Sequence, residues 1–290
     1  RLAIAATVRA LAVSIIVVAA LAPEAQAERR VALVIGNSAY AFGALANPKN
    51  DAELMARTLE AVGFEVTKLI DADQKTMKRA MIELGRTLRG SDSVGLFYYA
   101  GHGVQVDGEN YLIPIGAEIK DEREVAVESV AVGELLKTME RAAARINIAI
   151  LDACRNNPFA SSSRSGSRGL ARVDAAAGTI VAYATAPGDV AADGSGRNSP
   201  YAAALASAIS AGGVPIEDVF KRTRRSVLAS TGNKQTPWES SSLTGDFYFK
   251  AAPAAGAALG SVPAAGSDAR LAELNAYLKV KASTDVAELE

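Results

Sequence analysis

Side chains that form disulfides or bind transition metals are almost absent from this chain. Its 290 residues include one cysteine and one histidine. One cysteine cannot form an intramolecular disulfide, and one histidine does not provide the usual Cys/His ligand set of zinc. We therefore expect no disulfide framework, no metal site and no other cofactor.

An excess of charge of either sign is also absent. Lys and Arg total 31 and Asp and Glu total 32, which gives a formal net charge of −1. A nucleic-acid-binding domain carries a basic surface, and this composition does not supply one. With 49% hydrophobic residues, the chain is instead able to bury one sizeable core, and we expect a globular domain without nucleic acid as a partner.

The first 27 residues are typical of a secretory signal peptide. Arg1 and Arg9 make the first nine residues positively charged, and residues 11–21 form an apolar run. Ala25-Gln26-Ala27 then provides the small residues that signal peptidases require at a cleavage site. The pattern predicts a mature chain that begins at Glu28 and is secreted or periplasmic. The alternative is a retained membrane anchor, although the apolar run is shorter than the roughly 20 residues that span a bilayer.

Residues 28–250 alternate between short apolar segments and amphipathic ones. This order predicts an α/β fold with a mostly parallel sheet covered by helices on both faces. Leu54 to Val62 and Met77 to Leu88 have helical periodicity. The expected strands are 31–35, 65–70, 94–99, 146–151 and 179–184, and the further expected helices are 132–141, 199–211 and 216–228. Trp238 and a strand-like segment at 247–249 close the domain.

Two segments interrupt this alternation. Residues 156–172 contain five serines and three arginines, a composition that predicts an exposed loop open to proteases. Residues 251–267 are rich in Ala, Pro and Gly and are predicted to form a linker. The remaining residues, 268–290, are expected to form a short helical tail.

The only cysteine and the only histidine occupy equivalent places in the pattern. His102 and Cys154 each follow an apolar strand, 52 residues apart. Because parallel strands present their carboxyl ends at one edge of the sheet, the two side chains are expected to meet there. An imidazole can activate a thiol as a nucleophile and then protonate the leaving amine. The alternative is a buried structural cysteine and a histidine in a turn.

Small residues flank both side chains. Gly101 and Gly103 surround His102, and Ala153 precedes Cys154. They leave main-chain N–H groups accessible, so the N–H groups of Gly103 and Cys154 are candidates to stabilise a tetrahedral oxyanion.

The segments 98–103, Tyr-Tyr-Ala-Gly-His-Gly, and 152–155, Asp-Ala-Cys-Arg, resemble the histidine and cysteine motifs of the caspase and metacaspase family of cysteine peptidases. A third segment, 182–188, followed by Asn198-Ser199 and an amphipathic helix, is similar to the start of the small-subunit half of animal caspases. Bacterial caspase-like proteins and metacaspases are the nearest relatives that these motifs suggest. The resemblance implies a six-stranded, mainly parallel sheet between helices and a cysteine endopeptidase in which Cys154 is the nucleophile and His102 the general acid/base.

Departures from the animal pattern alter the expected specificity. Animal caspases bind an aspartate at P1, the residue before the cleaved bond, through arginines and a glutamine. Here the glutamine position is Asp152 and one arginine position is Asp193, while Asp51 matches a metacaspase aspartate implied to bind basic P1 residues. The resemblance therefore implies cleavage after Arg or Lys, since carboxylates pair with guanidinium or ammonium groups. Alternatively, Asp51 is a helix N-cap and Asp193 a turn residue.

Metacaspases often need calcium, but the sequence contains no cluster of carboxylates that would supply six to eight oxygens. The acidic run of Asp121, Glu122 and Glu124 is typical of a solvated face.

An acidic P1 site would also accept arginines in the predicted loop as local substrates. We expect self-processing after Arg164, Arg168 or Arg172, which lie ten to eighteen residues beyond Cys154. Two other classes of function remain. One is a catalytically weak or silent caspase-like interaction protein; the other, an esterase-like hydrolase, lacks the Gly-x-Ser-x-Gly elbow in the core.

Overall fold

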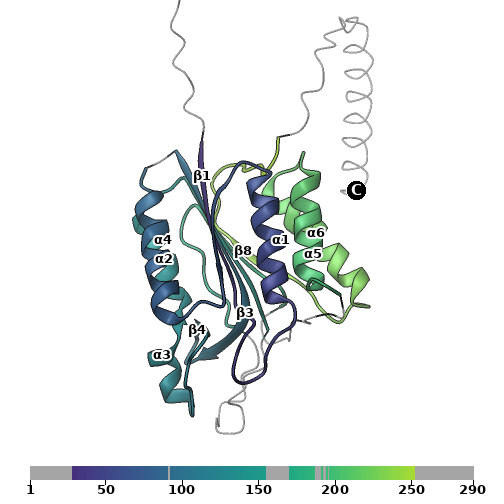
Figure 1. Ribbon diagram of the computed structural model, residues 1–290. Coiled ribbons are helices and arrows are strands. Elements are labelled where there is room, and N and C mark those ends of the chain that lie inside the picture. Colours follow the sequence, from purple (N-terminus) through teal and green to yellow (C-terminus); the bar gives the residue numbers. More distant parts are fainter. Residues whose placement is uncertain are drawn as a thin grey trace, which may run out of the picture.

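A computed structural model describes residues 28–90, 92–154, 170–186, 191, 194 and 196–251. These residues form one sheet with helices on both of its faces (Figure 1). The main path has six strands, of which the first five are parallel and the last is antiparallel, so the predicted α/β architecture is confirmed. In sheet order the strands are β2 (Glu65–Ile70), β1 (Arg29–Gly36), β3 (Ser93–Val106), β6 (Ile146–Cys154), β7 (Thr179–Tyr183) and β8 (Trp238–Ser241).

The helices divide between the two faces. One face carries α1 (Pro48–Glu60), α5 (Pro200–Ala211) and α6 (Ile216–Ser230), and the other carries α2 (Gln74–Thr87) and α4 (Val132–Arg141) (Figure 1). The predicted bounds of α4 are correct, and those of α5 and α6 differ by one or two residues.

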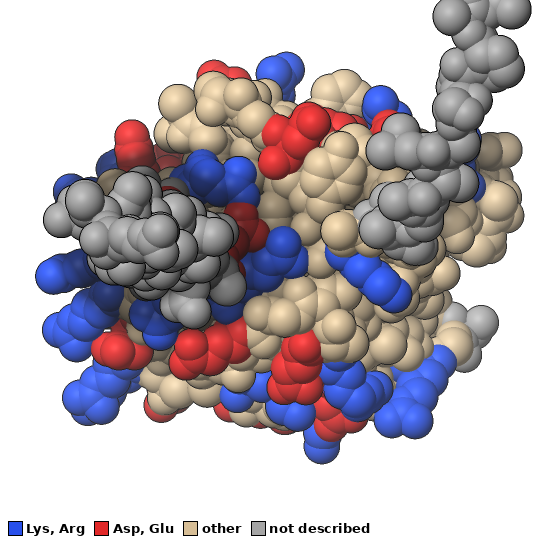
Figure 2. Space-filling model, turned by 90° about the horizontal axis from the view of Figure 1, so that it is seen from above, with Lys and Arg blue, Asp and Glu red and all other residues tan. Residues whose placement is uncertain are grey.

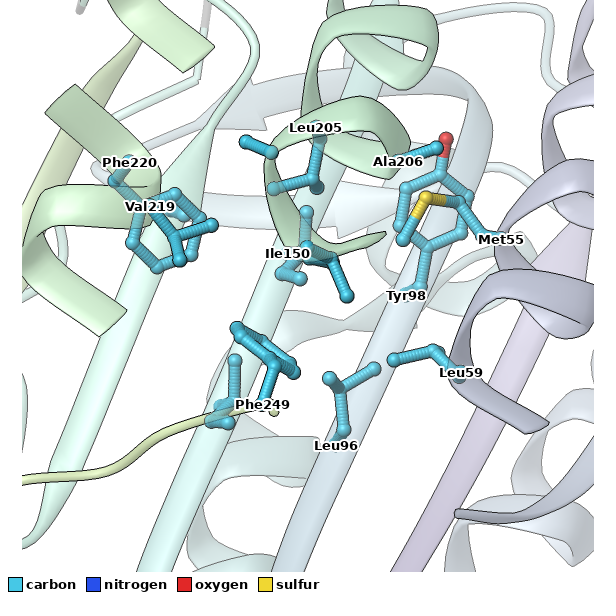
Figure 3. Packing of buried hydrophobic residues seen from close by; sticks show 14 of the residues in the cluster. Met55, Leu59, Leu96, Tyr98, Ile150, Leu205, Ala206, Val219, Phe220 and Phe249 are labelled. Atoms are coloured by element: carbon cyan, nitrogen blue, oxygen red, sulfur yellow. The ribbon is translucent and has the colours of Figure 1, made fainter. Parts of the chain in front are cut away.

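The central strands are apolar throughout because both of their faces are covered. Successive side chains of a strand point to opposite faces, so Leu96 and Tyr98 pack toward α1 while Phe97 and Tyr99 pack toward α2. Figure 3 shows the first of these two layers, in which Met55, Leu59 and Leu205 cover the sheet. This packing fixes the carboxyl ends of β3 and β6 side by side.

β3 extends beyond the predicted strand. It passes through Gly103 and pairs, at its far end, with β4 (Glu109–Leu112), which in turn pairs with β5 (Val130–Ala131). A short 3-10 helix, η1 (Glu122–Glu124), and a helical turn, α3 (Val125–Glu128), join β4 to β5. His102 thus lies where the strand leaves the main sheet and enters this smaller one.

The prediction of a strand at 247–249 is wrong. The antiparallel strand at this edge is β8, whereas Phe247 and Phe249 are buried side chains on a segment without strand pairing. The main-chain oxygens of Tyr248 and Phe249 accept hydrogen bonds from the Arg30 guanidinium instead of from a neighbouring strand. Arg30 also lies over the Phe247 ring, 5.0 Å from its centre, a distance typical of a cation–π contact.

Figure 2 shows the end of the molecule at which β1 begins. Basic and acidic side chains are interspersed on this face, in keeping with the near-zero net charge. In the part of the chain that the structure describes, no helix is long and apolar enough to cross a membrane. The predicted leader 1–27 and tail 268–290 lie outside the described residues, as does nearly all of the predicted linker 251–267.

Candidate active site

His102 and Cys154 lie opposite one another on adjacent strands, at the carboxyl end of their parallel pairing. They are register partners in the parallel pairing of β3 with β6, as the apolar patterns predict. Cys154 is described by its backbone alone, whereas the His102 side chain is buried, with 6% of its surface exposed. The fold therefore brings the two motif residues to neighbouring positions at one edge of the sheet.

A loop between β1 and α1 surrounds the His102 imidazole. The main-chain oxygen of Gly43 lies 2.6 Å from Nε2, and because a carbonyl oxygen only accepts, Nε2 carries the hydrogen. The ring of Tyr40 lies 4.4 Å from the imidazole, and the ring of Phe42 stacks on it at 5.8 Å with an interplanar angle of 18°. These three contacts fix both the plane and the tautomer of the imidazole.

Asp152 and Asp51 are buried and linked by one residue. Asp152 Oδ2 accepts hydrogen bonds from Tyr98 Oη at 3.0 Å and from Ser199 Oγ at 2.8 Å. Asp51 Oδ1 accepts from the Ser199 N–H at 3.0 Å and from Asn198 Nδ2 at 2.8 Å. Only 2% of the surface of Asp51 and 7% of that of Asp152 are exposed. Ser199 thus joins a carboxylate on α1 to a carboxylate on β6.

The tyrosines beside these carboxylates stay protonated. Burial and the charges of Asp152 and Asp51 raise the pKa of Tyr98 well above its usual value. Burial and the charge of Asp152 do the same to the pKa of Tyr201. Because the neutral phenol carries the proton, Tyr98 remains a hydrogen-bond donor to Asp152 at neutral and mildly alkaline pH.

The alternative role of Asp51 as a helix N-cap is wrong. α1 begins at Pro48 and its N-cap position is Asn47, so Asp51 lies within the first turn of the helix. Its carboxylate points to the start of α5, where Ser199 is the N-cap and its Oγ accepts from the Ala202 N–H at 3.0 Å. The helix dipoles at the starts of α1 and α5 favour a negative charge at this position.

Gly103 packs closely against its neighbours, so a larger residue at this position would press on them. A Cβ atom at this position would lie 3.0 Å from the Cβ of Ala153 and 3.3 Å from Cδ2 of Leu170. Gly103, whose N–H is a candidate oxyanion donor, thus lies beside Ala153, the residue that precedes Cys154 on the neighbouring strand.

Of the three predicted processing sites, the structure describes Arg172. Its side chain is exposed, but the main chain around it is held in place. Leu170 is buried, the Ala171 N–H and carbonyl both bond to the Asn110 side chain, and the Val173 N–H donates to Tyr183 Oη at 3.1 Å. Arg164 and Arg168 lie outside the described residues, as does Asp193.

The acidic run has a local structural role. The Asp121 side chain accepts from the Arg123 N–H at the start of η1 and pairs with the Arg123 guanidinium at 2.7 Å. Among the described residues, no group of three or more His, Cys, Asp and Glu side chains is arranged to hold a metal ion.

A family model described as the caspase domain matches residues 29–248, so the chain belongs to the caspase-domain family of cysteine peptidases. Caspase-1 from Spodoptera frugiperda has a similar fold, with a TM-score of 0.57 and 17% identity over 78% of this chain and 92% of that one. The predicted family and fold are therefore confirmed, and the silent interaction protein is not favoured.

Two curated relatives match by sequence. The mucosa-associated lymphoid tissue lymphoma translocation protein 1 of Homo sapiens and its homolog of Mus musculus are each 32% identical over 130 residues, which is 44% of this chain. The matched part is 15% of the length of each relative. The likeness thus extends to one segment of much longer proteins.

Sequence reasoning did not find several residues of this site. Tyr40, Phe42 and Gly43 come from a loop more than fifty residues before His102, and no local pattern marks them as its neighbours. Asn198 and Ser199 belong to a segment that resembles a family motif, and that resemblance does not predict their bonds to Asp51 and Asp152. An N-cap signal at Ser199, followed by Pro200 at the first helical position, could have indicated that a helix start faces the carboxylates.

Proposed function

We propose that this chain is a cysteine endopeptidase that hydrolyses peptide bonds after Arg or Lys, with Cys154 and His102 as a catalytic dyad. The observation that carries the proposal is the buried pair Asp51 and Asp152, joined through Ser199 beside the strand ends that hold His102 and Cys154. Asp152 stands two residues before Cys154, so a substrate whose scissile bond reaches the thiol has its P1 side chain near these carboxylates.

His102 serves as the base and later the acid. Because Nε2–H is bonded to Gly43, Nδ1 is the nitrogen that exchanges a proton with the thiol. The thiolate of Cys154 attacks the scissile carbonyl carbon, and the oxyanion that forms accepts hydrogen bonds from the N–H groups of Gly103 and Cys154. The imidazolium then protonates the leaving amine, which breaks the C–N bond and leaves a thioester.

Hydrolysis of the thioester reverses these roles. His102 takes a proton from water, the hydroxide attacks the thioester carbonyl, and the Cys154 thiolate leaves. Atoms and charge balance in both half-reactions with the peptide, one water molecule, Cys154 and His102.

Charge decides the P1 preference. Two carboxylates at one place repel an acidic P1 side chain and attract a guanidinium or ammonium group. Tyr98, Asn198 and Ser199 hold these carboxylates in fixed positions before substrate arrives. Asp193 is proposed as a third carboxylate of the same pocket on the family resemblance.

A covalent label tests this proposal at a single atom. A short peptide chloromethyl ketone ending in Arg should alkylate Cys154, with a thioether formed and chloride released, and intact-mass spectrometry should show one adduct per chain. The matched Asp-ending reagent should label much more slowly, and Cys154→Ala should take up neither. Equal rates for the Arg and Asp reagents, or no adduct with either, would argue against the proposal.

Self-processing should follow from the same specificity. A bond must extend into the active site to be cut, and the anchored segment from Leu170 to Val173 resists this. We propose cleavage after Arg164 and Arg168 in preference to Arg172, giving new termini at Ser165 and Gly169. Terminal sequencing and mass spectrometry of the native protein measure these cuts.

The same spectrum tests a separate prediction, that the leader is cleaved. If the protein is exported in this way, its mature chain should begin at Glu28.

Matched variants separate the three arginines. Processing should stop in the double variant Arg164→Ala/Arg168→Ala and continue in Arg172→Ala, while both retain activity on peptides. A dominant cut after Arg172 or Asp174 would contradict this assignment.

A further inference from the structure

Two buried tyrosine hydroxyls meet at the main chain of His102. The His102 N–H donates to Tyr40 Oη at 3.0 Å, and Tyr99 Oη donates to the His102 carbonyl oxygen at 2.8 Å. The two hydroxyl oxygens are themselves 3.0 Å apart. Both polar main-chain groups of this residue are therefore bonded to a tyrosine hydroxyl.

The Tyr40 hydroxyl provides a hydrogen-bond acceptor just beyond the point where the pairing of β1 with β3 stops. β1 pairs with β3 only as far as Gly36 opposite Ala100, two residues before His102. A buried N–H group needs an acceptor, and Tyr40 supplies it at the point where the ladder from β1 stops. Both tyrosines also lie within hydrogen-bond distance of the Ile113 carbonyl oxygen, so the pair joins β3 to the residue that follows β4.

Gly101 makes this arrangement possible. A Cβ atom at this position would lie 2.6 Å from Tyr40 Oη and 2.6 Å from Tyr99 Oη, closer than real contacts allow. A glycine before His102 thus leaves room for both hydroxyls at once.

Tyr98 provides an internal comparison. It precedes Tyr99 on β3, and its side chain lies in the other core layer, with its hydroxyl on Asp152. Consecutive tyrosines therefore serve the two parts of the site separately: one bonds a carboxylate, and the other bonds the histidine backbone.

We propose that Tyr40 and Tyr99 are positioning residues for His102, which hold its backbone so that the imidazole stays aligned between Gly43 and Cys154. The inference rests on the proposed function for its effect on catalysis. Tyr40 acts twice, since its hydroxyl fixes the backbone while its ring contacts the imidazole at 4.4 Å. Neither tyrosine is assigned a chemical step.

Tyr40→Phe and Tyr99→Phe remove one hydroxyl each and retain the rings. Small displacements of a catalytic group can lower turnover strongly, so each variant should lower kcat for an Arg-ending peptide by roughly ten- to a hundredfold while KM changes by less than about twofold. Because the hydroxyls form one network, the double variant should be scarcely slower than the worse single variant. Tyr99→Phe also gives an independent test should Tyr40→Phe prove poorly folded.

Two control variants also replace a tyrosine by phenylalanine and so remove one hydroxyl each. Tyr98→Phe should raise KM for the Arg peptide. Its effect should multiply with that of Tyr40→Phe, because the Tyr98 hydroxyl bonds Asp152 whereas the Tyr40 hydroxyl bonds the His102 main chain. Tyr248→Phe removes a hydroxyl from a partly exposed side chain outside the site and should change neither constant.

Imidazole nitrogen NMR of the full chain gives a readout that does not depend on turnover. His102 is the only histidine, so one pair of ¹⁵N signals reports its tautomer. The wild type should show a single Nε2–H tautomer, and Tyr40→Phe and Tyr99→Phe should show a mixture. Wild-type kcat together with an unchanged spectrum in Tyr40→Phe, or losses that simply multiply in the double variant, would overturn the proposal.

The two proposals can fail separately. A wild-type chain that cleaves no peptide, yet shows the fixed tautomer and loses it in Tyr40→Phe, would contradict the peptidase and support the positioning role. An active wild type with an unaffected Tyr40→Phe variant would support the peptidase and contradict the positioning role.

Discussion

Cys154→Ala should abolish peptide hydrolysis, and His102→Ala should lower kcat/KM by about a thousandfold or more. Removing either member of a nucleophile–base pair typically costs as much as removing both, because neither works without the other. His102 and Cys154 are the last register partners in the parallel pairing of β3 with β6, and the chain contains no second cysteine or histidine to replace them. Steady-state hydrolysis of an Arg-ending peptide measures the loss.

Circular dichroism and thermal unfolding provide the control, since both variants should remain folded. The small size of alanine is compatible with either position, and neither change introduces an unpaired buried charge. If folded Cys154→Ala retained most of the activity, the chain would not be a cysteine peptidase that uses Cys154. Loss of activity in Cys154→Ala together with full activity in His102→Ala would exclude His102 as the catalytic base, while Cys154 would remain the nucleophile.

Asp152→Asn should remove the preference for Arg and Lys while the protein stays folded. Asparagine keeps the shape of the side chain and can still accept from Tyr98 and Ser199, so the change removes mainly the charge. Truncating one partner of a buried charge pair costs about 2–5 kcal/mol, which corresponds to roughly thirty- to several-thousandfold in kcat/KM for an Arg peptide. Asp51→Asn should act in the same direction because its carboxylate shares Ser199.

The reactivity of the thiol separates a pocket effect from a dyad effect. A small uncharged alkylating reagent should label Cys154 at the same rate in Asp152→Asn as in the wild type, while hydrolysis of the Arg peptide falls. The control Asp121→Asn also removes one negative charge, but at a residue that pairs with Arg123 away from the site. It should alter neither the rate of alkylation nor the rate of Arg-peptide hydrolysis. Undiminished Arg hydrolysis in Asp152→Asn would exclude the acidic pair as the P1 site.

Much of the sheet could be predicted from local pattern alone. The apolar runs at β1, β3, β6 and β7 are buried on both faces, which removes polar alternation and makes each strand visible in the sequence. Parallel strands end at a common edge, so the pairing of His102 with Cys154 followed from their places after two such runs. The helix expected at 132–141 has the same bounds in the structure.

The remainder of the site depends on contacts that no local pattern encodes. Gly43 meets His102 across 59 residues, and Ser199 meets Asp51 across 148. Loop residues such as these acquire their role only when the strands on either side are in place. The error at Phe247–Phe249 has a similar origin, since the carbonyls of a strand-like motif there bond to Arg30, 219 residues away in the case of Phe249.

The central claim is that the chain cleaves after basic residues at a site built from Cys154, His102 and two buried carboxylates. Its most direct test is kcat/KM of the purified protein on three fluorogenic peptides that differ only in an Arg, Lys or Asp at P1. The account predicts hydrolysis of the Arg and Lys peptides with at least about a hundredfold preference over Asp, because a like-charge contact costs several kcal/mol. A preference for the Asp peptide, or no hydrolysis of any of the three, would contradict it.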